Sequence, residues 1–127
     1  DYGSIKFIRA VIAADAGQII DPDGLRSQLE GGLLQSASWT LKEQVKFDEK
    51  GITSQDWESY PIMTFADVPE IETILIDRKD SPVLGAGEAT QGPTAAAISN
   101  AIFDAVGLRL RRIPFTPDIV LEAAAEA

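Results

Sequence analysis

The feature that most constrains the fold is a long segment of helical periodicity that begins at Pro22. From Pro22 to about Glu43, apolar side chains recur at spacings that place them on one face of a helix: Leu25, Leu29, Leu33, Leu34, Ala37 and Leu41. Asp21 is a favourable N-cap, and proline suits the first helical position because its missing N–H would have no partner there. The segment therefore predicts an amphipathic helix against which the other elements must pack.

A glycine pair, Gly31-Gly32, lies in the middle of this predicted helix. Each glycine costs the helix about 1 kcal/mol relative to alanine. Because glycine has no side chain, the pair predicts that another backbone or a ligand approaches the helix closely at this point.

Strand patterns flank the helix on both sides. Residues 5–14 (IKFIRAVIAA) are rich in β-branched and aromatic side chains and predict a buried strand, and the alternation in residues 71–77 (IETILID) predicts another. Between them, a short hairpin is expected to turn at residues 49–51 (EKG).

Two further helices are predicted towards the C-terminus. One runs from about Pro93 to Val106 and stops near Gly107, and a short one ends the chain. The order of elements predicts a two-layer α+β domain, in which a small mixed sheet is covered by two helices. No linker or repeat divides the sequence, so residues 1–127 are expected to form a single domain.

Charge and residue usage exclude several classes of function. The formal net charge of −9 disfavours binding to nucleic acid or to an anionic membrane surface, since both need basic patches. No apolar run approaches the length that crosses a bilayer, so this segment is not expected to insert into a membrane. With no His and no Cys, the chain has no catalytic triad, disulfide or thiolate metal site, and proton chemistry falls to Asp, Glu, Lys or Tyr.

Glu88 stands out because it lies in a loop of small residues just ahead of a predicted helix. Its neighbours offer neither Lys nor Arg nor bulk: Gly85, Ala86, Gly87 and Ala89. One interpretation is structural, since a carboxylate near a helix N-terminus complements the helix dipole by a few tenths of a kcal/mol to about 1 kcal/mol. The other is functional: an acid among small residues can meet a ligand without steric collision. The residues alone leave both open.

Other candidate motifs are weaker. The sequence GAGEATQGP does not complete a dinucleotide fingerprint, and Asp21-Pro22-Asp23-Gly24 lacks the later ligands of a calcium loop and is typical of a turn with an N-cap. The arginines of the tail favour a solvated edge or an interface over an anion site: Arg109, Arg111 and Arg112. Polar residues of the glycine-bearing helix face solvent or serve a site: Gln28, Glu30 and Gln35.

Three separated motifs, in order, resemble one protein family. They are DAGQIIDPDGLRSQLEGGLLQSASWTLKE, SYPIMTFADVPEIETILI and LGAGEATQGPTAAAISNAIFDAVG. Together they are similar to the C-terminal part of the molybdenum-binding large subunit of the xanthine dehydrogenase and aldehyde oxidase family. Within it, the likeness is greatest to bacterial subunits of the isoquinoline oxidoreductase and nicotinate dehydrogenase type. The resemblance runs from about Phe7 to about Leu121.

The resemblance implies roles for four residues. Glu88, in the Gly-x-Gly-Glu loop, matches the glutamate that lies beside the molybdenum and acts as general base, with Gly87 and Ala89 beside the cofactor. Gln28 matches a glutamine that touches molybdopterin. No residue of the chain is assigned as a ligand to a metal. The family often has Gly where this chain has Ser36, a departure that bears on how the helix packs near the cofactor.

The resemblance also implies a context for the chain. It predicts a fragment of a longer molybdopterin-binding subunit, with molybdenum held by the cofactor in a cytosine dinucleotide form and iron-sulfur clusters on a small partner subunit. The reaction implied is water-derived hydroxylation of an aldehyde or an N-heterocycle. The isolated fragment is expected to be inactive and to self-associate through exposed apolar surface. The alternative is a non-catalytic acidic α+β interaction module.

Overall fold

The computed structural model describes residues 2–126 and has one α-helix at its centre. Around it lie two small sheets and two further helices. The elements in chain order are β1 (Arg9–Asp15), α1 (Pro22–Leu41), β2 (Phe47–Asp48), β3 (Gly51–Ile52), a short 3₁₀ helix η1 (Phe65–Asp67), β4 (Glu70–Ile76), α2 (Gln91–Val106) and α3 (Pro117–Ala125).

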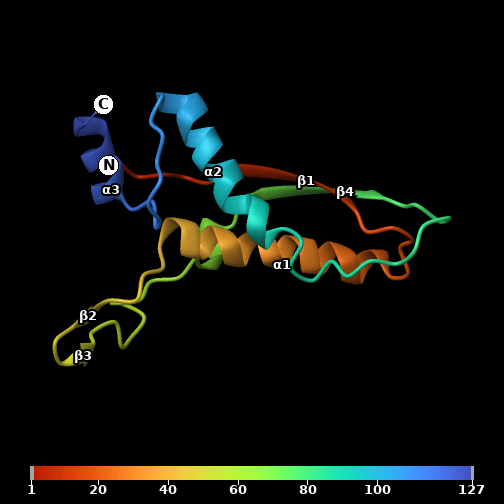
Figure 1. Ribbon diagram of the computed structural model, residues 1–127, viewed down its shortest axis with the longest axis horizontal. Coiled ribbons are helices and arrows are strands. Elements are labelled where there is room, and N and C mark those ends of the chain that lie inside the picture. The colour runs from red at the N-terminus through yellow and green to blue at the C-terminus, as the bar shows by residue number, and fades with distance from the viewer. Residues whose placement is uncertain (1, 127) are drawn as a thin grey trace.

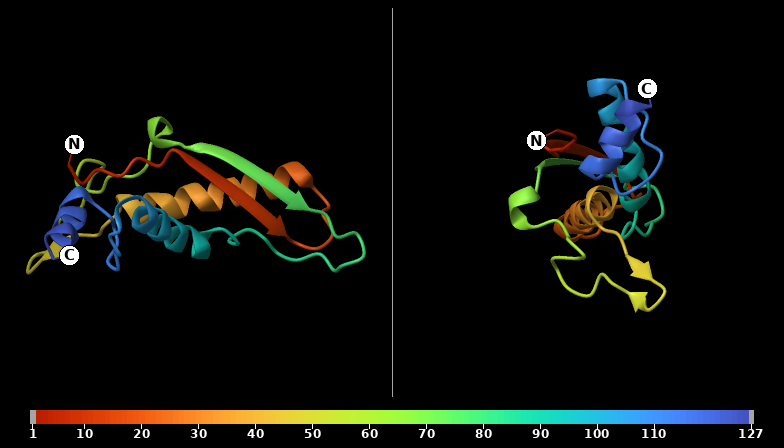
Figure 2. Two further views of the ribbon diagram at one scale, coloured as in Figure 1. Left: turned by 90° about the horizontal axis from the view of Figure 1, so that it is seen from above. Right: turned by 90° about the vertical axis from the view of Figure 1, so that its left-hand side faces the viewer.

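Strands β1 and β4 pair in parallel, in a register that joins Arg9 to Glu70 and Asp15 to Ile76. Parallel strands need a crossover connection, and α1 supplies it. Figure 1 shows α1 running along the strand pair, and the views in Figure 2 confirm that the pair and the helix form two layers. Between the layers Ile12 packs with Leu29 and Leu33.

Helix α2 crosses α1 on a different face from the sheet (Figure 2). A second apolar cluster lies here and extends to the tail and α3: Ala37, Ile98, Ile102, Leu110, Phe115 and Val120. Helix α1 is therefore buried on two faces, one against the sheet and one against α2. No helix within residues 2–126 is both long and apolar enough to cross a membrane.

The α+β class and the helix predictions are confirmed. The Asp21 side chain accepts a hydrogen bond from the Gly24 N–H at 3.0 Å, as expected of an N-cap. Helix α2 ends at Gly107, whose positive φ of 74° favours glycine. It begins two residues before Pro93, because the first turn of a helix tolerates a residue without an N–H donor.

The strands differ from the prediction in two respects. Residues 5–8 are not part of β1, because the partner strand begins only at Glu70. The Val68 N–H, which would be the next to face β1, donates instead to the Phe65 carbonyl of η1 at 3.4 Å. The parallel and antiparallel pairs also form two separate two-stranded sheets, β1-β4 and β2-β3, instead of one mixed sheet. The β2-β3 hairpin extends away from the helices (Figure 1), so it does not meet the parallel pair.

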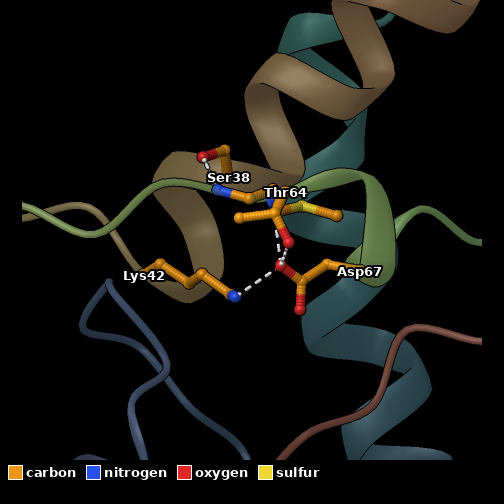
Figure 3. Close-up of polar contacts among 5 residues, drawn as sticks. Ser38, Lys42, Thr64 and Asp67 are labelled. Carbon is orange, nitrogen blue, oxygen red and sulfur yellow. Dashed lines mark hydrogen bonds and ion pairs between the residues drawn. The ribbon is translucent and has the colours of Figure 1, made fainter. Parts of the chain in front are cut away.

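A polar cluster joins the C-terminal end of α1 to the segment before β4 (Figure 3). Asp67 accepts hydrogen bonds from Lys42 Nζ at 2.8 Å, from the Thr64 N–H at 2.8 Å and from the Thr64 hydroxyl at 3.0 Å. Nearby, the Met63 N–H donates to the Ser38 hydroxyl at 2.9 Å. The Lys42 ammonium, then the Thr64 N–H, lower the pKa of Asp67 from 3.8 to about 2.

This cluster predicts a pH-dependent contribution to stability. Because the folded pKa of Asp67 lies below its unfolded value, the contribution is present above about pH 4 and is lost as the pH falls through about 2. Asp67→Asn should lower the free energy of unfolding by about 1 kcal/mol near neutral pH, since the pair is partly exposed. Urea unfolding of the 127-residue chain at several pH values measures this difference. The exposed Asp80→Asn variant is the control, and a difference for Asp67→Asn that persists unchanged at about pH 2 contradicts the assignment.

Candidate functional site

The loop that carries Glu88 is brought to the middle of α1 by the course of the chain after β4. It first pairs with the turn that follows β1, where the Arg78 N–H donates to the Gly17 carbonyl at 3.1 Å and the Leu84 N–H to the Ala16 carbonyl at 3.0 Å. It then runs back along α1 to the start of α2 (Figure 1). Glu88 thus reaches the glycine-bearing part of α1 from a distant part of the sequence.

An open hollow of about 790 Å³ lies between this loop and α1. The four predicted site residues all line it, together with a glycine and a second glutamine: Gln28, Gly85, Gly87, Glu88, Ala89 and Gln91. The approach is close, because a Cβ atom added at Gly87 would lie 3.3 Å from Gln28 Nε2. The structure therefore brings the amide of α1 and the carboxylate of the loop to one surface.

The Glu88 side chain is exposed in this hollow. Within residues 2–126 its carboxylate makes no hydrogen bond or ion pair, so no cation or N–H donor in that range engages it. It lies two residues before Thr90, the N-cap of α2. The carboxylate is consequently free to meet a group that enters the hollow.

Thr90, Ser36 and Gln91 hold the loop against α1. The Thr90 hydroxyl donates to the Leu29 carbonyl at 2.7 Å, and the Ser36 hydroxyl donates to the Gln91 carbonyl at 2.8 Å. The Gln91 amide donates to the Gln35 side-chain oxygen at 2.6 Å. None of these contacts was predicted from the sequence, although the Ser36 departure marked the place where one of them forms.

The glycine pair has two different explanations. A Cβ atom at Gly32 would lie 2.5 Å from Thr90 Oγ1, so Gly32 makes room for a side chain of the loop, whereas the sequence predicted a backbone or a ligand at this point. Gly31 is exposed and a Cβ there would have no neighbour within 4 Å. Gly85, which lines the hollow, has equally open space.

The hollow suits an organic cofactor better than a metal ion bound directly by the chain. Within the described residues, no three His, Cys, Asp or Glu side chains gather to hold a metal. The glutamine amides at residues 28 and 91 can both donate and accept hydrogen bonds, as the edge of a pterin requires. Small residues on the loop leave its backbone open to a flat ligand. The residues present therefore fit molybdopterin.

The remaining sequence candidates lie elsewhere. Arg109 stacks over the Phe103 ring at 4.1 Å and donates to Asn100, while Arg112 pairs with Glu122. These exposed contacts are typical of a solvated edge. Glu30 accepts a hydrogen bond from the Thr73 hydroxyl at 3.0 Å and so joins α1 to β4. An apolar hollow of about 780 Å³ lies between residues 3–11 and α2, away from Glu88.

Residues 1–69 match the family model of the molybdopterin cofactor-binding domain. The chain is also 45% identical over 121 residues to a subunit of the nicotinate dehydrogenase of Pseudomonas putida, covering 95% of this chain and 10% of that protein. It is 32% identical over 127 residues to the aldehyde oxidoreductase molybdenum-binding subunit of Escherichia coli, covering 94% of this chain and 17% of that one.

Solved structures agree with the sequence relatives. The aldehyde oxidoreductase of Desulfovibrio desulfuricans superimposes with a TM-score of 0.83 at 32% identity, over 95% of this chain and 14% of that one. The Cu,Mo-CO dehydrogenase has the same fold, with a TM-score of 0.83 over 99% of this chain and 17% of that one, at 21% identity. The chain thus spans between 10% and 17% of these proteins.

The chain belongs to the molybdopterin cofactor-binding domain family. The resemblance to molybdenum-binding subunits of the xanthine dehydrogenase and aldehyde oxidase family is confirmed, including the isoquinoline 1-oxidoreductase and nicotinate dehydrogenase relatives.

Proposed function

We propose that the chain forms one wall of the active site of a molybdenum hydroxylase. The enzyme oxidises an aldehyde or an N-heterocycle by adding oxygen derived from water, and Glu88 is its general base. The observation that carries the proposal is the convergence of Gln28 and Glu88, far apart in sequence, on one open hollow. Family membership favours this function over a non-catalytic interaction module.

In this proposal, residues of the chain bind the cofactor and accept a proton. Gln28 donates or accepts hydrogen bonds at the edge of the pterin, and Gly87 and Ala89 let the cofactor lie against the loop. A carboxylate oxygen of Glu88 takes the proton from the water molecule whose oxygen enters the product. When bound, molybdopterin supplies the redox chemistry.

In this proposal, other parts of the enzyme form the rest of the active site. The proposal includes the remainder of a large subunit, a small subunit that carries iron-sulfur clusters, and a cytosine dinucleotide form of the cofactor. The apolar hollow beside residues 3–11 supports it, because surface of that kind is normally covered. Without a cover, the isolated fragment is expected to self-associate and to be inactive.

Labelled water tests the proposal in the full-length protein assembled with its partner subunit. Nicotinate and an aldehyde serve as probes, because relatives carry these words in their names. The preparation should contain molybdenum and pterin, and the oxygen added to the probe should come from ¹⁸O-labelled water. Incorporation of oxygen from labelled O₂ instead, or a preparation without pterin, rejects the proposed function.

A further inference from the structure

We propose that Thr90 is a positioning residue that fixes the Glu88 carboxylate relative to Gln28. The inference rests on the proposed function of Glu88, but it concerns the backbone that carries that side chain. General-base catalysis depends on placement, and a displacement of about 1 Å can cost about 100-fold in rate. Whatever holds the loop therefore matters to turnover.

Glu88 does not hold itself in place. Within residues 2–126 its carboxylate makes no hydrogen bond or ion pair that could orient it. Its own turn is closed by long backbone hydrogen bonds: the Ala89 N–H donates to the Ala86 carbonyl at 3.4 Å, and the Gln91 N–H to the Glu88 carbonyl at 3.2 Å. The position of the carboxylate must therefore come from the residues that anchor this turn.

Thr90 provides the anchor through a buried hydroxyl. A threonine at an N-cap ordinarily accepts a hydrogen bond from its own helix, but the Thr90 side chain makes no such bond. It donates instead across to the carbonyl of Leu29, which is fully buried. One hydroxyl thus joins the residue directly after Gln28 to the residue two positions after Glu88.

Neighbouring contacts keep Thr90 in this orientation. The Thr94 hydroxyl donates to the Thr90 carbonyl at 2.6 Å, and the Ser36 hydroxyl to the carbonyl of the next residue, Gln91. Gly32 leaves the space that the Thr90 side chain needs. The hydroxyl is therefore held in a fixed place, and the loop with it.

The experiment compares Thr90→Val and Thr90→Ser in the full-length enzyme with its partner subunit. Valine keeps the shape of threonine and removes the hydroxyl, and serine keeps the hydroxyl. Thr40→Val is the matched control: Thr40 Oγ1 is buried on α1 and has no hydrogen-bond partner within the described residues. Turnover per bound molybdenum, KM for the nicotinate or aldehyde probe, and hydrogen exchange of amides 86–92 are measured for each.

Thr90→Val should lower kcat about tenfold or more with KM changed less than about twofold, and should speed exchange of amides 86–92. Thr90→Ser should restore most of the wild-type kcat and most of the wild-type protection of these amides. Thr40→Val should match wild type in both. The inference is overturned if Thr90→Val keeps kcat within about twofold of wild type. It is also overturned if Thr90→Val and Thr90→Ser lower kcat by the same factor.

Glu88→Gln, measured alongside, separates this inference from the proposed function. If Glu88→Gln loses turnover while Thr90→Val does not, only the positioning role fails. If Glu88→Gln keeps turnover, the proposed base is wrong, and unchanged exchange in Thr90→Val then also rejects the anchor. Should Thr90→Val not fold, Gly32→Ala carries the test, because its Cβ would displace Thr90 Oγ1. Wild-type kcat and exchange in Gly32→Ala would overturn the inference.

Discussion

Gln28→Ala should lower the molybdopterin content of the full-length protein by up to about tenfold at limiting cofactor, while the melting temperature stays close to wild type. Gln28 is exposed on α1 and borders the hollow, so its amide is free to bond to a ligand. Loss of one hydrogen bond of about 1 kcal/mol corresponds to about a fivefold loss of affinity, and about 1.5 kcal/mol to roughly tenfold. Alanine is a better helix former than glutamine, so the fold should not suffer.

Metal analysis and pterin fluorescence measure the occupancy of the Gln28→Ala variant. Gln44→Ala, the same substitution at an exposed residue outside the hollow, is the control and should retain its cofactor. A fall in melting temperature with full occupancy and full activity would mark Gln28 as a structural residue.

Local chemistry was enough to predict the helices, because their signals lie within a few residues. Asp21 and Pro22 define the start of α1, and Gly107 defines the end of α2. The length of β1 was not predictable in the same way, since pairing depends on where the partner strand begins. The η1 turn, far from β1 in the sequence, sets that limit by taking up the Val68 N–H, and periodicity does not contain such a relation between distant segments.

The site was predicted only in part, for a related reason. Family resemblance, not spacing, placed Gln28 and Glu88 in a common site, and both line the hollow. Thr90 was missed because its hydroxyl bonds to α1, a contact between distant segments that the local sequence does not contain. Gly32 was the one available signal: it predicted a close approach without naming the residue that approaches.

The central claim, that Glu88 is the general base of a molybdenum hydroxylase, is tested most directly by the turnover of Glu88→Gln in the full-length enzyme. Glutamine keeps the size of the side chain but does not accept a proton near neutral pH. Since the carboxylate makes no hydrogen bond or ion pair within residues 2–126, its replacement should leave the fold and the molybdenum content unchanged.

Turnover of Glu88→Gln per bound molybdenum should fall by about 10²–10⁴-fold, the range of general-base contributions. Glu49→Gln, at an exposed carboxylate in the turn of the β2-β3 hairpin, is the control and should keep wild-type turnover. A Glu88→Gln enzyme that retains more than about a tenth of wild-type turnover, with molybdenum fully bound, would contradict the assignment of Glu88 as the base.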